Sequence, residues 1–245
     1  MFAHYRTKRP GTPLFQMLFY GAIRRFVRVL FAIVYRARII GAENVPRSGP
    51  LLLVANHQSY LDPPLVGSTV YTRHIDFIAR MGLFKFSGFF GWFIATLNSI
   101  PIKEEGSDTA AIKEVLRRLE DGRAVLIFPE GSRSETGRMD DFKRGVAVLV
   151  KRSRCPVLPI AVEGCYDAWP RGTSRPRLFG ARVAIRYGDP ISHEDLMANG
   201  ADQALVRLHD QINEMRRALR EDMRRATKGK YPPAGAADQP TPAAG

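Results

Sequence analysis

The sequence predicts a single α/β domain with a mostly parallel central sheet flanked by helices, preceded by an amphipathic helix that associates with a membrane. Three observations point to this fold. After residue 37, short apolar runs alternate with longer helical segments, an order typical of a parallel sheet covered by helices. The run at 50–55 is apolar throughout, as in a strand buried on both faces. The residues before 37 are basic and strongly apolar instead.

These patterns divide the chain into three parts. Residues 1–37 form the N-terminal helix, 38–230 the α/β domain and 231–245 a tail. With 245 residues, 45% of them hydrophobic, the chain can bury one sizeable core. The tail is rich in Pro, Ala and Gly and cannot bury enough apolar surface to stay ordered, so we expect disorder there.

Seven strands and five helices are expected in the α/β domain. The strands are 38–41, 50–55, 75–79, 98–102, 123–127, 156–162 and 181–187. The helices are 63–71, 83–97, 107–121, 143–152 and 202–226. The segment 83–97 is rich in aromatic residues and has one charge, so it is expected to be buried or to face lipid.

The N-terminal helix is the most basic part of the chain. Residues 1–40 contain eight Lys and Arg and no acidic residue. Within 14–35, polar positions recur every four residues on an otherwise apolar helix, which is typical of a helix lying on an anionic membrane with its arginines at the headgroups. The alternative is a core-packing helix with a solvated arginine face. A spanning helix is disfavoured by the three arginines near its middle, Arg24, Arg25 and Arg28.

The overall charge calls for an anionic partner. The chain has 37 Lys and Arg against 24 Asp and Glu, a formal net charge of +13. An anionic membrane surface fits better than nucleic acid, because the basic excess lies on an apolar helix and not in an aromatic groove. We therefore expect no nucleic acid partner, and a peripheral or monotopic location on the cytoplasmic face of the cell membrane.

The cysteines and the N-terminus bear on compartment and metals. Cys155 and Cys165 are too few for a disulfide framework and lack metal-ligand spacing, which favours a reducing compartment and no metal site. The N-terminus has no uninterrupted apolar core followed by a cleavage site, so export is not expected.

The segment 56–63, Asn-His-Gln-Ser-Tyr-Leu-Asp-Pro, joins a strand to a helix. Asp62 stands at the preferred N-cap position, before two prolines that suit a first helical turn. On one continuous helix His57 and Asp62 would point about 140° apart, but a turn can fold the carboxylate onto the ring. Such a pair is a general base with an orienting acid. The alternative is a hydrogen-bonded histidine beside an ordinary N-cap.

A second polar segment, Phe128 to Ser134 (Phe-Pro-Glu-Gly-Ser-Arg-Ser), follows another strand. Gly131 permits a close backbone approach, and Arg133 with neighbouring hydroxyls can bind a phosphate through two hydrogen bonds. A surface turn in which Glu130 pairs with Arg133 is the alternative. The segment alone leaves both open.

Taken together and in this order, the two segments resemble the glycerolipid acyltransferase family, specifically the 1-acylglycerol-3-phosphate acyltransferases. Two further blocks agree with that family, the apolar run 100–103 ending in Lys103 and the proline-bearing strand 157–162. The resemblance covers roughly residues 38–190. Two positions depart from the family pattern, with Lys103 where arginine is usual and Ser132 where threonine is commonest.

The resemblance implies transfer of a fatty acyl group, without a cofactor or metal, from acyl-CoA or acyl-carrier protein to the free hydroxyl of 1-acylglycerol-3-phosphate, giving phosphatidate. His57 would act as general base and Asp62 would orient its ring. The acceptor's glycerol-phosphate would contact Lys103, Glu130, Gly131, Ser132 and Arg133. The alternatives are a different lysolipid acceptor, for example a lyso amino-acid lipid, and a non-catalytic protein that binds an anionic membrane.

Overall fold

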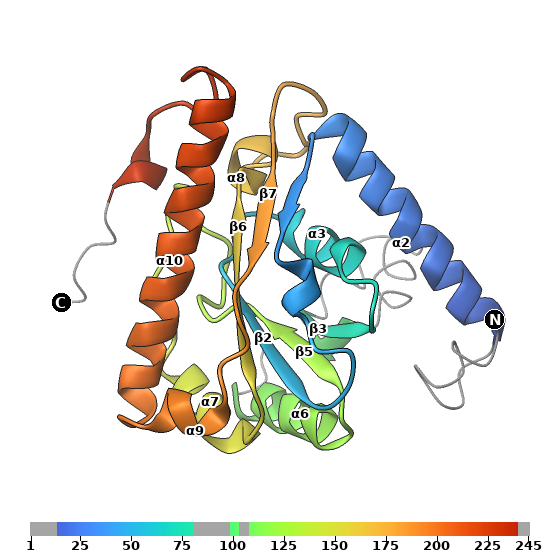
Figure 1. Ribbon diagram of the computed structural model, residues 1–245, viewed down its shortest axis with the longest axis vertical. Coiled ribbons are helices and arrows are strands. Elements are labelled where there is room, and N and C mark those ends of the chain that lie inside the picture. The colour runs from blue at the N-terminus through green and yellow to red at the C-terminus, as the bar shows by residue number, and fades with distance from the viewer. Residues whose placement is uncertain (1–13, 81–98, 103–107, 240–245) are drawn as a thin grey trace.

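The computed structural model describes residues 14–80, 99–102 and 108–239 (Figure 1). At its centre is a seven-stranded sheet with the order β1-β7-β6-β2-β5-β3-β4. The strands are β1 Arg38–Ile40, β2 Leu51–Ala55, β3 Ile75–Arg80, β4 Ser99–Ile102, β5 Ala124–Ile127, β6 Val157–Glu163 and β7 Ala184–Tyr187. All seven predicted strands are present.

The sheet is mostly parallel, as predicted. β2 pairs in parallel with β5 on one side and with β6 on the other. β3 lies parallel to β4 and β5, while β7 runs antiparallel to β6 and parallel to β1. The carboxyl ends of β2, β5 and β6 therefore meet at one edge of the sheet, where the segments after these strands lie together.

Helices cover both faces of the sheet. The helices are α2 Leu14–Val34, α3 Asp62–Thr69, α6 Asp108–Glu120, α7 Gly145–Ser153, α8 Cys165–Ala168, α9 His193–Met197 and α10 Ala201–Ala226. Two short 3-10 turns, η1 and η2, span Ala42–Asn44 and Ala236–Asp238. In Figure 1, α10 covers one face, and α3, with α2 outside it, covers the other. The short α8 and α9 were not predicted, and the predicted helix 83–97 lies outside the described residues.

The core follows the expected patterning. Every residue of β2 and β6 is buried, as continuous apolar runs in a sheet covered on both faces should be. α10 places Leu208, Ile212 and Leu219 against the sheet at helical spacing. The same face buries Arg216, whose Nη1 lies 3.0 Å from Oε2 of the buried Glu163 at the end of β6. This ion pair joins α10 to the edge of the sheet where the candidate site lies.

α2 packs on the domain through the side that carries two of its arginines. Arg24 Nη1 donates to Val70 O, at the end of α3, at 3.0 Å. The guanidinium carbons of Arg24 and Arg28 lie 4.8 and 4.3 Å from the Tyr71 ring centroid. The prediction that these two arginines reach membrane headgroups is therefore corrected: each has a partner on the protein, which holds α2 against α3.

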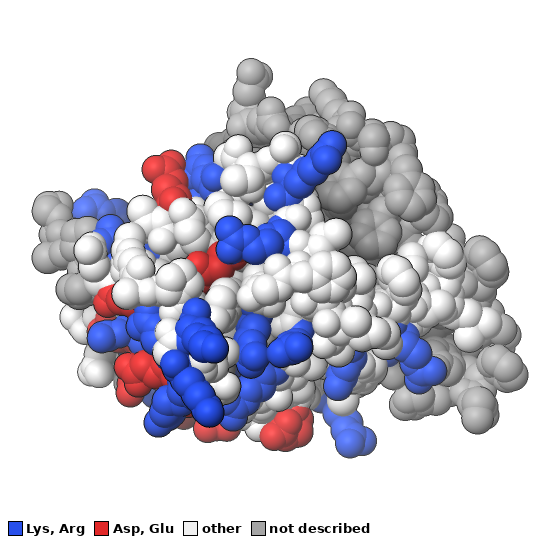
Figure 2. All heavy atoms as spheres, turned by 90° about the horizontal axis from the view of Figure 1, so that it is seen from above, with Lys and Arg blue, Asp and Glu red and all other residues white. Residues whose placement is uncertain are grey.

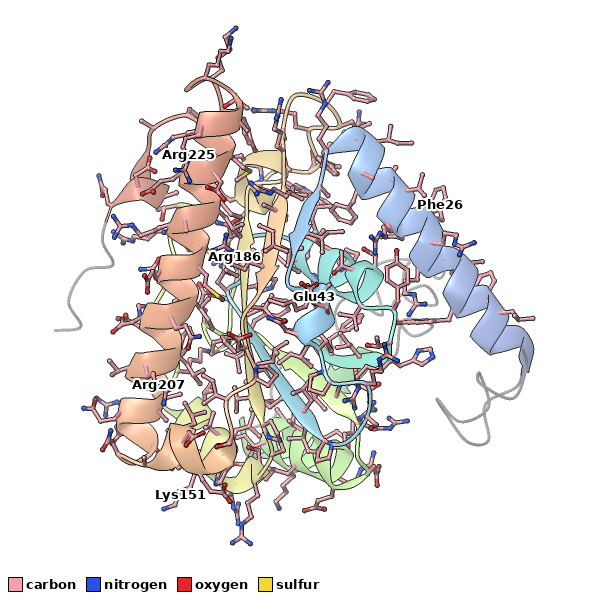
Figure 3. All side chains as sticks on the ribbon, in the orientation of Figure 1. Phe26, Glu43, Lys151, Arg186, Arg207 and Arg225 are labelled. Atoms are coloured by element: carbon pink, nitrogen blue, oxygen red, sulfur yellow. The ribbon has the colours of Figure 1, made fainter. Side chains whose placement is uncertain are left out.

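The outward side of α2 is apolar. Phe26 and Ile33 are 67% and 68% exposed, and Phe26 points away from the domain (Figure 3). Leu18, Val29 and Leu30 are also exposed. Of the helices in the described ranges, none is long and apolar enough to cross a bilayer.

Residues 231–239 pack against α10, contrary to the disorder predicted for them. Arg220 Nη2 donates to Pro233 O at 2.8 Å, and Arg216 Nη2 donates to Ala237 O at 3.0 Å. Arg224 also pairs with Asp238 at 2.7 Å. The low apolar content of the segment is offset by these hydrogen bonds from α10 to its carbonyls, which composition does not reveal.

Candidate active site

The turn between β2 and α3 brings His57 and Asp62 into contact. The His57 Nδ1 atom lies 2.8 Å from Asp62 Oδ2. The same oxygen accepts the backbone N–H groups of Gln58 and Ser59, at 2.6 and 2.7 Å. Asp62 is the first residue of α3 and Leu61 precedes it as N-cap, so the predicted N-cap role is wrong. The carboxylate instead folds back over the turn.

This geometry fixes the chemistry of the ring. An ionised carboxylate can only accept hydrogen bonds, so Nδ1 is the donor in this contact, and in the neutral imidazole Nε2 is then the nitrogen with a lone pair. The Asp62 side chain is fully buried, while that of His57 is 17% exposed. The buried carboxylate thus orients an imidazole that remains within reach of a substrate.

The segment after β5 holds His57 from the other side. The ring stacks on Phe128, with centroids 4.1 Å apart and an angle of 19° between the planes. His57 N donates to Glu130 Oε1 at 2.6 Å, and Ser134 N donates to His57 O at 2.8 Å. The two segments recognised in the sequence therefore form one unit around the histidine.

Glu130 occupies an unexpected position. It is buried, and its second oxygen, Oε2, accepts the N–H of Asp140 at 3.0 Å. Burial raises the pKa of Glu130 to about 8, against the lowering effect of its two backbone hydrogen bonds. Both oxygens are thus engaged with the backbone, and the alternative of a Glu130–Arg133 pair is not what the structure contains.

Arg133 lies on an aromatic platform. Its guanidinium carbon is 3.5 Å from the centroid of Tyr60, and Tyr60 in turn meets Trp169 edge-on at 5.5 Å. Within the described ranges no carboxylate lies within ion-pair distance of Arg133. Partial burial lowers the pKa of this guanidinium. The arrangement fixes a cation on the ring of Tyr60, which belongs to the same turn as His57, and a guanidinium can bind an anion through two hydrogen bonds.

Gly131 is favoured by its backbone conformation, while its neighbour Lys143 has a flexible side chain that could move. The Gly131 φ of 73° lies in the left-handed region, and a Cβ there would come within 2.3 Å of Lys143 Cε. Its N–H donates to Phe128 O at 3.0 Å, so that group is already used. Ser132 lies half-buried between Gly131 and Arg133, while Lys103 lies outside the described residues.

Several contacts at the site were missed from the sequence. The Lys143 side chain lies next to Gly131, and Phe128 stacks on the His57 ring. The Tyr60 ring, which contacts Trp169, lies under the Arg133 guanidinium. Tyr60 and Phe128 fall inside the two recognised segments, which is the signal that could have drawn attention to them. Lys143 and Trp169 are brought in by the fold alone.

The chain is similar to proteins of known function. Residues 36–163, just over half of the chain, match the Acyltransferase family. The chain is 31% identical, over 72% of its length, to the chloroplastic 1-acyl-sn-glycerol-3-phosphate acyltransferase of Arabidopsis thaliana and covers 50% of that protein. It is 25% identical to the 1-acyl-sn-glycerol-3-phosphate acyltransferase of Streptococcus pneumoniae, over 88% of this chain and 78% of the relative.

A solved structure shares the fold. The crystal structure of the 1-acyl-sn-glycerophosphate acyltransferase PlsC from Thermotoga maritima superposes with a TM-score of 0.69 at 24% identity, covering 89% of this chain and 83% of that one. The chain spans about half the length of the two chloroplastic relatives that it matches. From the matched residues, which contain both recognised segments, the chain belongs to the Acyltransferase family.

Proposed function

We propose that this protein transfers a fatty acyl group from acyl-CoA or acyl-carrier protein to the free hydroxyl of 1-acylglycerol-3-phosphate, giving phosphatidate. The observation that carries the proposal is the His57 Nδ1–Asp62 Oδ2 contact of 2.8 Å, beside a guanidinium that no described carboxylate neutralises. The two relatives reported above, both named 1-acyl-sn-glycerol-3-phosphate acyltransferase, support the choice of substrate.

The reaction uses His57 Nε2 as general base. The acceptor hydroxyl attacks the thioester carbonyl while Nε2 takes its proton, and a new C–O bond forms. The tetrahedral intermediate then expels the thiolate, the C–S bond breaks, and the imidazolium returns the proton to sulfur. Asp62 stabilises the imidazolium and holds the tautomer, and neither residue is acylated.

The acceptor's phosphate is held by Arg133, with Lys103 assisting as the family resemblance implies. The guanidinium can form two parallel hydrogen bonds to a phosphate, and the Tyr60 ring keeps it in one orientation. Gly131 and Ser132 line the same turn. Glu130 has a different role, because its carboxyl group accepts the backbone N–H of His57 and so fixes that backbone.

The protein works at the cytoplasmic face of the cell membrane as a peripheral or monotopic enzyme. The outward face of α2, which exposes Leu18, Phe26, Val29, Leu30 and Ile33, supports this location. An apolar helix face of this kind binds at the level where lysolipid headgroups meet acyl chains. The active site then receives an acceptor that stays in the bilayer.

Acyl transfer by the purified protein tests the proposal. The protein is incubated with radiolabelled acyl-CoA or acyl-carrier protein and a panel of lysolipids dispersed in detergent. Labelled phosphatidate from lysophosphatidate is the expected product. Transfer only to another lysolipid would establish the alternative acceptor, and transfer to none would rule out the enzyme.

A further inference from the structure

The loop joining α8 to β7, residues 169–183, exposes both apolar and basic side chains. Leu178 and Phe179, in its second half, are 55% and 71% exposed. The loop contains no acidic residue. Its four arginines are Arg171, Arg175, Arg177 and Arg182, of which the first three are exposed.

Hydrogen bonds fix the first part of this loop. Arg177 N donates to Ala168 O at 2.7 Å, which closes a turn directly before Leu178. Trp169 Nε1 donates to Thr173 O at 3.0 Å. Neither Leu178 nor Phe179 belongs to the hydrophobic core or packs against it. The loop therefore presents two apolar side chains to solvent directly after a hydrogen-bonded turn, and their exposure adds nothing to the packing of the hydrophobic core.

One end of the loop is attached to the candidate active site. Ser59 Oγ, in the turn between His57 and Asp62, donates to Trp169 O at 2.9 Å. Arg171 Nη1 donates to Arg133 O at 3.0 Å. The loop thus forms part of the rim beside the residue that binds the acceptor's phosphate.

The other end of the loop is attached to the end of α2. Val183 N donates to Tyr35 O at 3.2 Å, and Arg38 N donates to Val183 O at 3.0 Å. Figure 1 shows the loop and the last turn of α2 at the same end of the molecule. Figure 2 looks onto this end, where Lys and Arg side chains gather. The loop therefore connects the end of α2 with the turn that carries His57.

We propose that the loop 169–183 is a second membrane contact, in which Leu178 and Phe179 enter an anionic bilayer and Arg175 and Arg177 bind lipid phosphates. Two adjacent exposed apolar side chains in a loop with four arginines and no acidic residue complement a surface of anionic headgroups above acyl chains. The proposal rests on the lipid substrate proposed above. A loop bound to the membrane would hold the rim of the site against the bilayer, so that a lysolipid headgroup reaches Arg133 without leaving the membrane.

A fluorescent label tests this contact directly. Both native cysteines are buried, so Phe179→Cys in the full chain gives one accessible thiol for an environment-sensitive dye. The matched control is Val206→Cys, a site 52% exposed near the start of α10. Its neighbour in the sequence, Arg207, lies at the opposite end of α10 from Arg225 in Figure 3. With phosphatidylglycerol vesicles, emission from residue 179 should shift to the blue and be quenched by acyl-brominated lipid.

The control dye at residue 206 should remain in water. If the protein binds vesicles while the dye at residue 179 also remains in water, the loop is not a membrane contact. Absence of vesicle binding by the labelled protein would overturn the proposal as well, and would leave a protein partner as the occupant of the surface.

A double substitution gives a second, independent measurement. Leu178→Ser with Phe179→Ser should weaken binding to phosphatidylglycerol vesicles by about tenfold or more, since two apolar side chains no longer leave water. An unchanged thermal unfolding midpoint is the folding control. Unchanged vesicle affinity would contradict the proposal. Acyl transfer in detergent tests the proposed function separately, so either idea can fail alone.

Discussion

Glu130 accepts the backbone N–H of His57 at 2.6 Å and so joins two segments that lie 73 residues apart in the chain. Its other oxygen holds Asp140 N, and neither oxygen remains directed at a substrate. The carboxyl group therefore works through the histidine. It fixes the backbone from which the imidazole projects, while Asp62 fixes the ring itself.

Glu130→Gln should lower kcat by roughly tenfold to a hundredfold and leave the KM for lysophosphatidate nearly unchanged. The amide can accept only one of the two backbone hydrogen bonds, so the histidine shifts from its productive position. Steady-state kinetics with varied acceptor separates the two constants. A large rise in KM with unchanged kcat would place Glu130 against the acceptor instead.

Glu130 also makes stability depend on pH. Burial raises its pKa from 4.5 to about 8. Between these values the folded protein holds a proton that the unfolded chain has lost, so the contribution of Glu130 to the free energy of unfolding falls as pH rises. Urea unfolding of the wild type and Glu130→Gln at about pH 5 and about pH 8 measures it, and the wild type should lose more stability. Equal losses would mean that Glu130 keeps an ordinary pKa.

Arg133→Ala should raise the KM for lysophosphatidate by roughly tenfold to a hundredfold, because a charge-assisted pair of hydrogen bonds to phosphate is lost. Arg133→Lys should recover only part of the affinity. Tyr60→Leu should raise the same constant more weakly by removing the ring under the guanidinium, whereas Tyr60→Phe keeps the platform. An unchanged KM in Arg133→Ala would point to another anchor for the phosphate.

The arginines of α2 should separate into two kinds. Arg24→Gln should reduce the free energy of unfolding by about 2 kcal/mol, since it removes the bond to Val70 O and the contact with Tyr71. Arg25 is exposed, and Arg25→Gln should leave stability intact while weakening binding to anionic vesicles by about 1 kcal/mol, or roughly fivefold. Urea unfolding and vesicle co-sedimentation measure both variants. The opposite assignment would mean that α2 presents its other side to the membrane.

Much of the fold could be predicted from the sequence because the strands are buried on both faces. Continuous apolar runs such as Leu51–Ala55 identify such strands without any tertiary information. The His57–Asp62 pair was also predictable, since its two members lie five residues apart across one turn. Local patterns were sufficient where the partners are close in the chain.

The remaining features depend on partners that are distant in the chain. Arg24 and Arg28 face the domain because both guanidinium groups contact the Tyr71 ring. The helical pattern of α2 does not reveal this contact. Residues 231–239 are ordered by arginines of α10, although their composition is that of a disordered segment. The role of Glu130 likewise requires knowing that β2 and β5 are neighbours.

The rate of acyl transfer by His57→Ala tests the general-base assignment most directly. With detergent-dispersed lysophosphatidate and saturating acyl donor, kcat should fall by a factor of about 10² to 10⁴, because only the proton-transfer step needs the imidazole. Asp62→Asn should lose most of the activity through misorientation of the ring. Binding to phosphatidylglycerol vesicles, which does not use this side chain, should be unchanged in His57→Ala. A histidine variant that folds, binds vesicles and turns over at nearly the wild-type rate would contradict the mechanism.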